Sequence, residues 1–277
     1  MKAPEFIQIC NFVCIMPKMK LQEIKEFLDE KADYYQRFEF IQDDPISIPH
    51  QFTEKEDIEC AGLLAATIAW GNRKSILRSA DAMLKKMEYK PYSYILNYNK
   101  QEERYWKKQG SLHRTLKGTD LDFLLRGVQK IFKKQKNLED AFLTESGEAI
   151  EGIKKFRRLM LETEHEPRSL KHLGDAEKGS ACKRLNMYLR WMVRPAEKGV
   201  DFGIWKSINP AGLSIPLDIH SGNTARSLGI LKRKNNDLDA VYELDNILRK
   251  FDKADPVKYD FALFGIGVFE PDLFKTK

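Results

Sequence analysis

The chain has 277 residues, of which 42% are hydrophobic and 11% aromatic, enough for a large core in one domain or two lobes. These values exclude a largely disordered chain, and a charged fraction of 32% predicts a well-solvated surface. The net charge of +6 is compatible with a polyanionic partner but does not require one.

The cysteines and the N-terminal segment indicate in which cellular compartment the protein is expected. The four cysteines form neither a CxxC pair nor a disulfide framework, which predicts a reducing, cytoplasmic compartment: Cys10, Cys14, Cys60 and Cys182. The apolar stretch Phe6 to Met16 is too short and too polar to span a membrane. We therefore expect no membrane partner, and no His and Cys spacing indicates a metal site or a cofactor.

The start of the folded unit has two interpretations. Met19 opens a charged amphipathic run, so residues 1–18 are either an N-terminal extension from an upstream start or part of the protein proper. Residues 19–277 are expected to form a single helical unit, either one body or two interleaved lobes, because no flexible linker or repeat divides them.

Helical periodicity dominates the chain. Apolar residues at three- and four-residue spacing and capping signals predict helices in this order: 20–38, 54–87 with a break near Gly71, 119–134 capped by Thr119 or Asp120, 138–162, 179–193, 219–229, 237–250 and 256–267. The segment CAGLLAATIAW is apolar all round and is expected in the core. Strand signals are scarce, and the proline-containing segments 42–52 and 193–216 are expected as extended connections. The predicted fold class is all-α.

Two segments carry the candidate chemistry. In KGSACKRLNMYLRW, Gly179 to Lys183 is typical of a tight turn opening a helix, whose free backbone N–H groups, Ser180 included, suit a phosphate. In IPLDIHSGNTARSLG, Asp218 precedes a new helix, where a carboxylate caps the helix, faces a cleft, or does both.

Together these segments resemble the helix-hairpin-helix base-excision DNA glycosylases, especially the bifunctional 8-oxoguanine glycosylase/lyase branch. That family has a Gly-x-Gly-x-Lys hairpin with a nucleophilic lysine, then a segment with a catalytic aspartate and a helix ending in Leu-Gly. The matching positions here are Gly179, Lys183, Asp218, His220, Arg226, Leu228 and Gly229, with Ala181 in place of the second hairpin glycine. The whole chain also resembles an uncharacterised bacterial protein family, which implies no activity.

The resemblance implies two closely packed helical lobes with a cleft between them. It implies an enzyme, a DNA N-glycosylase and AP lyase that removes an oxidised purine from damaged duplex DNA in base-excision repair. Lys183 would form a Schiff base with the sugar, and Asp218 would stabilise the sugar cation and move protons. The expected DNA-binding residues are Gly179, Ser180, Arg184, Asn72, Arg73 and His220, and Asn72 would insert beside the extruded base. Such a protein would be cytoplasmic and, in a bacterium, associated with the nucleoid.

Each residue also has a plainer interpretation. Lys183 alone would be a surface lysine, Asp218 a helix cap and His220 a structural histidine, so the argument depends on their combination. Trp70, Trp191, Met187 and Phe264 would wall a base pocket, although such residues more often form core. The alternative functions are a non-catalytic DNA- or RNA-binding protein that retains the fold, and a helical interaction scaffold.

Overall fold

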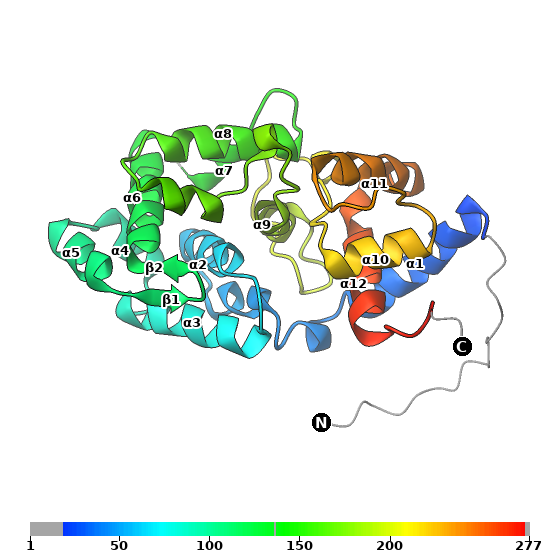
Figure 1. Cartoon of the computed structure of the whole chain (residues 1–277), viewed down its shortest axis with the longest axis horizontal. Coiled ribbons are helices and arrows are strands. Elements are labelled where there is room, and N and C mark those ends of the chain that lie inside the picture. The colour runs from blue at the N-terminus through cyan, green and yellow to red at the C-terminus, as the bar shows by residue number, and fades with distance from the viewer. Residues whose placement is uncertain (1–18, 136, 275–277) are drawn as a thin grey trace.

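The computed structural model describes residues 19–135 and 137–274 (Figure 1). The all-α prediction is confirmed: the described chain is built of helices and 3₁₀ turns, with one short hairpin of β1 (Ser111–His113) and β2 (Leu116–Lys117). The expected extension 1–18 lies outside the described residues, as do Cys10 and Cys14. Cys60 and Cys182 are buried and unpaired.

The helices form two groups on either side of α9 (Figure 1). The first lobe contains α2 (Lys55–Thr67), α3 (Arg73–Lys86), α4 (Pro91–Leu96), α5 (Lys100–Lys108), α6 (Gly118–Lys134), α7 (Leu138–Phe142) and α8 (Ala149–Leu161). The second contains α1 (Leu21–Tyr35), α10 (Ile219–Ser227), α11 (Leu238–Phe251) and α12 (Tyr259–Phe269). Since α1 packs on α12, the described chain begins in the second lobe, crosses to the first and returns through α9 (Lys183–Val193).

The predicted break near Gly71 is confirmed. Helix α2 ends at Thr67, and Gly71 has a φ of 98°, a left-handed conformation that side chains other than glycine adopt at a cost. Asn72 then caps α3, its side chain accepting the backbone N–H of Ser75 at 3.2 Å. The turn between α2 and α3 therefore places Trp70 and Arg73 at one end of the first lobe.

Several boundaries were predicted wrongly. The helix expected at 138–162 is two helices, α7 and α8, because Gly147 at φ 68° lies in a turn between them. Helix α9 begins at Lys183 and not at 179, since Gly179 and Cys182 both have positive φ. The residue before α6 is Lys117, and Asp120 contributes from within the first turn by accepting the Lys117 N–H at 2.7 Å.

Other local structure was missed. Segment 88–117 contains α4, α5 and the hairpin, which the apolar spacing did not reveal. The 42–52 connection is not simply extended, because Pro45–Ser47 and Pro49–Gln51 form 3₁₀ turns. The long connection after α9 is confirmed, and it contains one 3₁₀ turn, Pro210–Gly212. The final helix continues past Gly267 to Phe269.

The core fixes the position of α9. Helix α2 is buried from Ile58 to Thr67, as expected, and packs so closely on α9 that a Cβ at Gly62 would lie 2.9 Å from Met192 Cε. Tyr188 and Trp191 of α9 are fully buried. Each large apolar side chain buried in this way contributes about 1.5–3 kcal/mol to the stability of the folded state. This burial fixes the position of α9 and therefore of the side chains at its N-terminus.

A buried ionic network joins α9 to the second lobe. Arg190 pairs with Asp201 at 3.3 Å and with Asp260 at 2.5 Å. Arg194 pairs with Asp201 at 2.5 Å and with Asp255 at 2.7 Å. Because these arginines have carboxylate partners inside the protein, the second half of α9 and the start of α12 are held in one arrangement.

Candidate functional site

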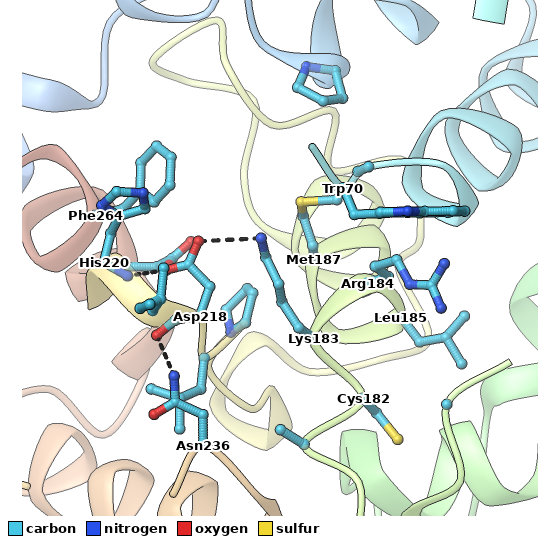
Figure 2. A pocket seen from close by; sticks show the side chains of 18 of the residues that line it. Trp70, Cys182, Lys183, Arg184, Leu185, Met187, Asp218, His220, Asn236 and Phe264 are labelled. Carbon is cyan, nitrogen blue, oxygen red and sulfur yellow. Dashed lines mark hydrogen bonds and ion pairs between the residues drawn. The ribbon is translucent and has the colours of Figure 1, made fainter. Parts of the chain in front are cut away.

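A cleft of about 770 Å³ lies where α9, the turn before α3, and α10 to α12 meet (Figure 2). Its walls come from segments far apart in the sequence, including Trp70, Lys183, Asp218 and Phe264. The volume is in the range of pockets that hold a small organic ligand or a single nucleotide base. The expected cleft between lobes is therefore present, and it contains the two segments that carry the candidate chemistry.

The turn Gly179 to Cys182 leads directly into α9. Gly179 has a φ of 79°, and its carbonyl accepts the Leu238 N–H at 2.9 Å, which ties the turn to the start of α11. Cys182, directly before the helix, has a φ of 47°. The left-handed residues are thus the first and fourth of the turn, so Ala181 does not occupy a position that requires glycine.

Lys183 and Asp218 meet in the cleft. Lys183 is the first residue of α9, and its Nζ lies 3.1 Å from Asp218 Oδ2 (Figure 2). The lysine side chain is 35% exposed and the aspartate side chain 10% exposed. Because the amine and the carboxylate are both accessible from the cleft, a ligand there can contact either group.

Asp218 performs two tasks at once. Its Oδ1 accepts the backbone N–H groups of His220 at 2.8 Å and Ser221 at 2.9 Å, which makes it the N-cap of α10. Its Oδ2 faces Lys183, and its carbonyl accepts Asn236 Nδ2 at 2.8 Å. The cap fixes the carboxylate in one orientation, so its free oxygen is directed at the amine.

His220 and Arg73 complete the side of the cleft around Phe264. His220 Nδ1 donates to the Gly267 carbonyl at 3.3 Å, which leaves its Nε2 free for another partner. The Arg73 guanidinium lies over the Phe264 ring, 5.5 Å from the centroid. Both residues line the cleft, as do Gly179, Ser180 and Arg184.

Arg184 occupies the opposite side, next to Trp70 (Figure 2). Its guanidinium lies 4.9 Å from the Trp70 ring centroid and donates to the carbonyls of Thr67 and Lys171. Burial lowers the pKa of Arg184 to about 10. Within the described residues no carboxylate lies within 4.0 Å of the lining cations Arg73, Lys171 or Arg184, so the cleft has positive charge available for an anion on both sides.

Asn72 is the expected DNA-binding residue that does not line the cleft. Its side chain is used as the cap of α3, although the residue lies between Gly71 and Arg73 at the cleft edge. Of the four residues expected to wall a base pocket, Trp70, Met187 and Phe264 line the cleft. Trp191 is fully buried in the core and is not part of it.

Among the charged residues of the cleft that sequence reasoning missed, Arg190 and Asp260 are buried, with 8% and 5% exposure. Both lie within otherwise apolar helical runs, MYLRWMV and YDFALF. A charge inside an apolar run is a signal that a buried partner exists, but the sequence does not say which residue that partner is.

The described residues contain no group of His, Cys, Asp and Glu side chains arranged to hold a metal ion. In the same part of the chain no helix combines the length and the apolar character needed to cross a membrane.

Comparison with known proteins gives one match. A family described as a protein of unknown function (DUF2400) matches residues 44–269. No curated protein and no solved structure matches the chain. Because the family model covers most of the sequence and spans the whole cleft from Asp44 to Val268, the chain belongs to the DUF2400 family.

Proposed function

We propose that this protein is a base-excision DNA glycosylase with β-lyase activity that removes an oxidised purine from damaged duplex DNA. Lys183 is the nucleophile and Asp218 its acid/base and electrostatic partner. The observation that carries the proposal is the 3.1 Å approach of the Lys183 amine to the Asp218 carboxylate in one cleft. The hairpin-like turn before Lys183 and the order of the two segments support it through the resemblance to helix-hairpin-helix glycosylases.

The chemistry follows from the pair. Asp218 takes a proton from Lys183, and the neutral amine attacks the sugar C1′, forming a C–N bond as the bond from C1′ to the base breaks. The base leaves with the electron pair and receives the proton that Asp218 had accepted, which returns Asp218 to the carboxylate form. The nitrogen then loses a further proton, and the C=N bond of the Schiff base forms as the C1′–O4′ bond breaks and O4′ takes up a proton. Removal of a C2′ proton then expels the 3′ phosphate with the electron pair of its C–O bond. Asp218 also stabilises the positive charge that develops on the sugar.

The electrostatics and size of the cleft support a nucleic acid substrate. Arg73, Lys171 and Arg184 have no carboxylate partner within 4.0 Å in the described part of the chain, which suits a polyanionic backbone. An extruded base fits the volume of about 770 Å³, and Trp70, Met187 and Phe264 offer apolar contacts to it. Such an enzyme acts in the cytoplasm and, in a bacterium, on the nucleoid.

The same cations of the cleft favour one alternative, a DNA- or RNA-binding protein that performs no chemistry. Arg73, Lys171 and Arg184 would bind a polyanion whether or not Lys183 reacts. Binding and chemistry therefore have to be measured separately.

The test is borohydride trapping of the full-length protein on duplex DNA that contains 8-oxoguanine or an abasic site. We expect a covalent adduct with the wild type and with Lys178→Ala, and none with Lys183→Ala, because Lys183 is the lysine of the described residues that pairs with Asp218. Lys178 is a matched control: it lies in the same segment, and its side chain is 84% exposed.

Asp218→Asn should lower the trapping rate at least about 100-fold while DNA affinity changes less than about threefold, since it removes an acid/base group and keeps a polar cap. DNA binding without an adduct or base release on any lesion would establish the non-catalytic alternative. Adduct formation by Lys183→Ala would remove Lys183 from the mechanism.

A further inference from the structure

A second carboxylate, Asp260, lies in the cleft beside Asp218. It is the second residue of α12 and only 5% exposed, yet it lines the same cavity as the Lys183 and Asp218 pair. The proposed chemistry does not use it. A buried carboxylate at such a place needs partners that hold it, and those partners indicate what it does.

Its two oxygens connect the helices that present the reacting pair. Asp260 Oδ2 accepts from Arg190 Nη1 at 2.5 Å, and Oδ1 accepts from Ser221 Oγ at 3.4 Å. Arg190 lies on the same face of α9 as Lys183, two turns further along. Ser221 is in the first turn of α10, and its backbone N–H is capped by Asp218. Asp260 therefore joins α9 and α10 within the cleft where Lys183 meets Asp218.

The charged groups that share the cleft or an ion-pair network with Asp260 come from several elements. They are Lys183 and Arg190 on α9, Asp218 and His220 on α10, Asp44 before the Pro45–Ser47 turn, Arg73 on α3, and Asp201 in the connector, which shares Arg190. Burial, together with the negative charge of Asp218, raises the pKa of Asp260 to about 6, while Arg190 and Lys183 act to lower it. At neutral pH Asp260 is thus ionised and adds negative charge beside the reacting pair.

We propose that Asp260 is a positioning residue for the Lys183 and Asp218 pair. Through Ser221 it holds the first turn of α10, and by like-charge repulsion it directs the Asp218 carboxylate toward the Lys183 amine. The Ser221 hydrogen bond and the charge of Asp260 together keep the Asp218 carboxylate paired with that amine before a ligand arrives. The meaning of this role for catalysis rests on the proposed function, but the effect on Lys183 does not need a substrate.

The experiment measures the reactivity of the Lys183 amine in the full-length, DNA-free protein. Acetylation of Lys183 by acetic anhydride is followed by peptide mass spectrometry, with exposed Lys108 as the internal reference. We expect Asp260→Asn to acetylate Lys183 at least about threefold faster than the wild type at pH 7, because the amine loses a neighbouring negative charge and a firmly held partner. The ratio should fall toward one near pH 5.5, where Asp260 of the wild type takes up a proton.

Asp245→Asn is the matched control. Asp245 is also buried, burial raises its pKa to about 6, and it accepts from the Ile215 N–H, but it lies on α11 outside the cleft. This variant should leave Lys183 acetylation within about 1.5-fold of the wild type. Ser221→Ala removes the link to α10 without changing a charge. It should give a smaller increase in the same direction, and it serves as the test if Asp260→Asn does not fold.

Three results would overturn the assignment: an unchanged Lys183 rate in both Asp260→Asn and Ser221→Ala, an equal increase in Asp245→Asn, or a ratio that does not vary with pH. The last two would indicate general loosening of the fold. Borohydride trapping on DNA separates this proposal from the proposed function. If no variant forms an adduct but acetylation behaves as expected, the glycosylase proposal fails and the positioning role of Asp260 remains.

Discussion

The two ends of α9 hold their charged side chains in different ways. At the N-terminal end, Lys183 has one carboxylate partner and a side chain that is 35% exposed. Near the C-terminal end, Arg194 has two carboxylate partners and is 3% exposed. Water and ligands can replace the partner of an exposed ion pair at little cost, whereas breaking a closed pair leaves an unpaired buried charge. Helix α9 is therefore held firmly at its C-terminal end by buried ion pairs, while the charged side chain in its first turn is accessible to a ligand.

The same difference separates the two sides of the cleft. On one side Asp218 is fixed as a cap and paired with Lys183. On the other, Arg184 donates only to carbonyl groups and lies against Trp70. The first side is suited to proton transfer and the second to holding an anion or a polarised ring, because an unpaired guanidinium retains donors for a ligand.

Loss of a carboxylate partner at the C-terminal end of α9, where Arg190 and Arg194 are buried, should have the largest effect on the free energy of unfolding. Asp201→Asn should lower the free energy of unfolding by about 3–5 kcal/mol, because both Arg190 and Arg194 lose a buried partner. Lys183→Met at the open end should cost less than about 1 kcal/mol. Urea unfolding monitored by circular dichroism gives both values. Equal losses in the two variants would show that the ends of α9 do not differ.

Glu59 of α2 tests a buried acid whose cation, Lys55, lies near the limit of ion-pair distance. It is 0% exposed, accepts from Trp205 Nε1 at 2.6 Å and lies 3.9 Å from Lys55 Nζ. Burial raises the pKa of Glu59 to about 7, from 4.5 in the unfolded chain. The folded state therefore binds a proton that the unfolded state releases, so this contribution to stability is complete below pH 4.5 and is lost as the pH rises to about 7.

Glu59→Gln removes the ionisable group, so the variant does not lose stability as the pH rises. The glutamine keeps an oxygen that accepts a hydrogen bond from Trp205. We expect the variant to be about 3 kcal/mol more stable than the wild type at pH 8, with the difference disappearing toward pH 4.5. Urea unfolding between pH 4.5 and 8 measures it, with Glu145→Gln on the surface as the control. A difference that stays constant across this range would contradict the assignment of the charge to Glu59.

Substitution of the cleft cations should have a smaller effect, and this effect should be on DNA binding and not on folding. The double variant Arg73→Gln/Lys171→Gln should reduce the slope of log affinity against log salt for duplex DNA by about 2, since two phosphate contacts are lost. Arg104→Gln/Lys108→Gln removes the same charge from exposed positions on α5, which lies at the end of the first lobe away from α9 and α10 (Figure 1), and should leave the slope unchanged. Equal slopes in the two double variants would place the polyanion elsewhere.

Much of the local structure was predictable because its signals lie within a few residues of one another. The three- and four-residue spacing located α1, α6 and α11, and Gly71 marked the break between α2 and α3. The placement of Lys183 in a first turn and of Asp218 as an N-cap was also predicted correctly. The break at Gly147 was missed, since an isolated glycine in an amphipathic run does not by itself end a helix.

The sequence by itself thus determined most of the longer helices, the cap at Asp218 and the residue types at the head of α9 and α10, because propensity and capping act over one or two turns. Only the tertiary structure decided that Lys183 and Asp218 meet, that Trp191 belongs to the core, and that Asp260 shares the cleft with the pair. Those contacts depend on how α9, α10 and α12 pack. A charged residue in an apolar run predicts that a partner exists, but which residue is the partner depends on how distant segments pack.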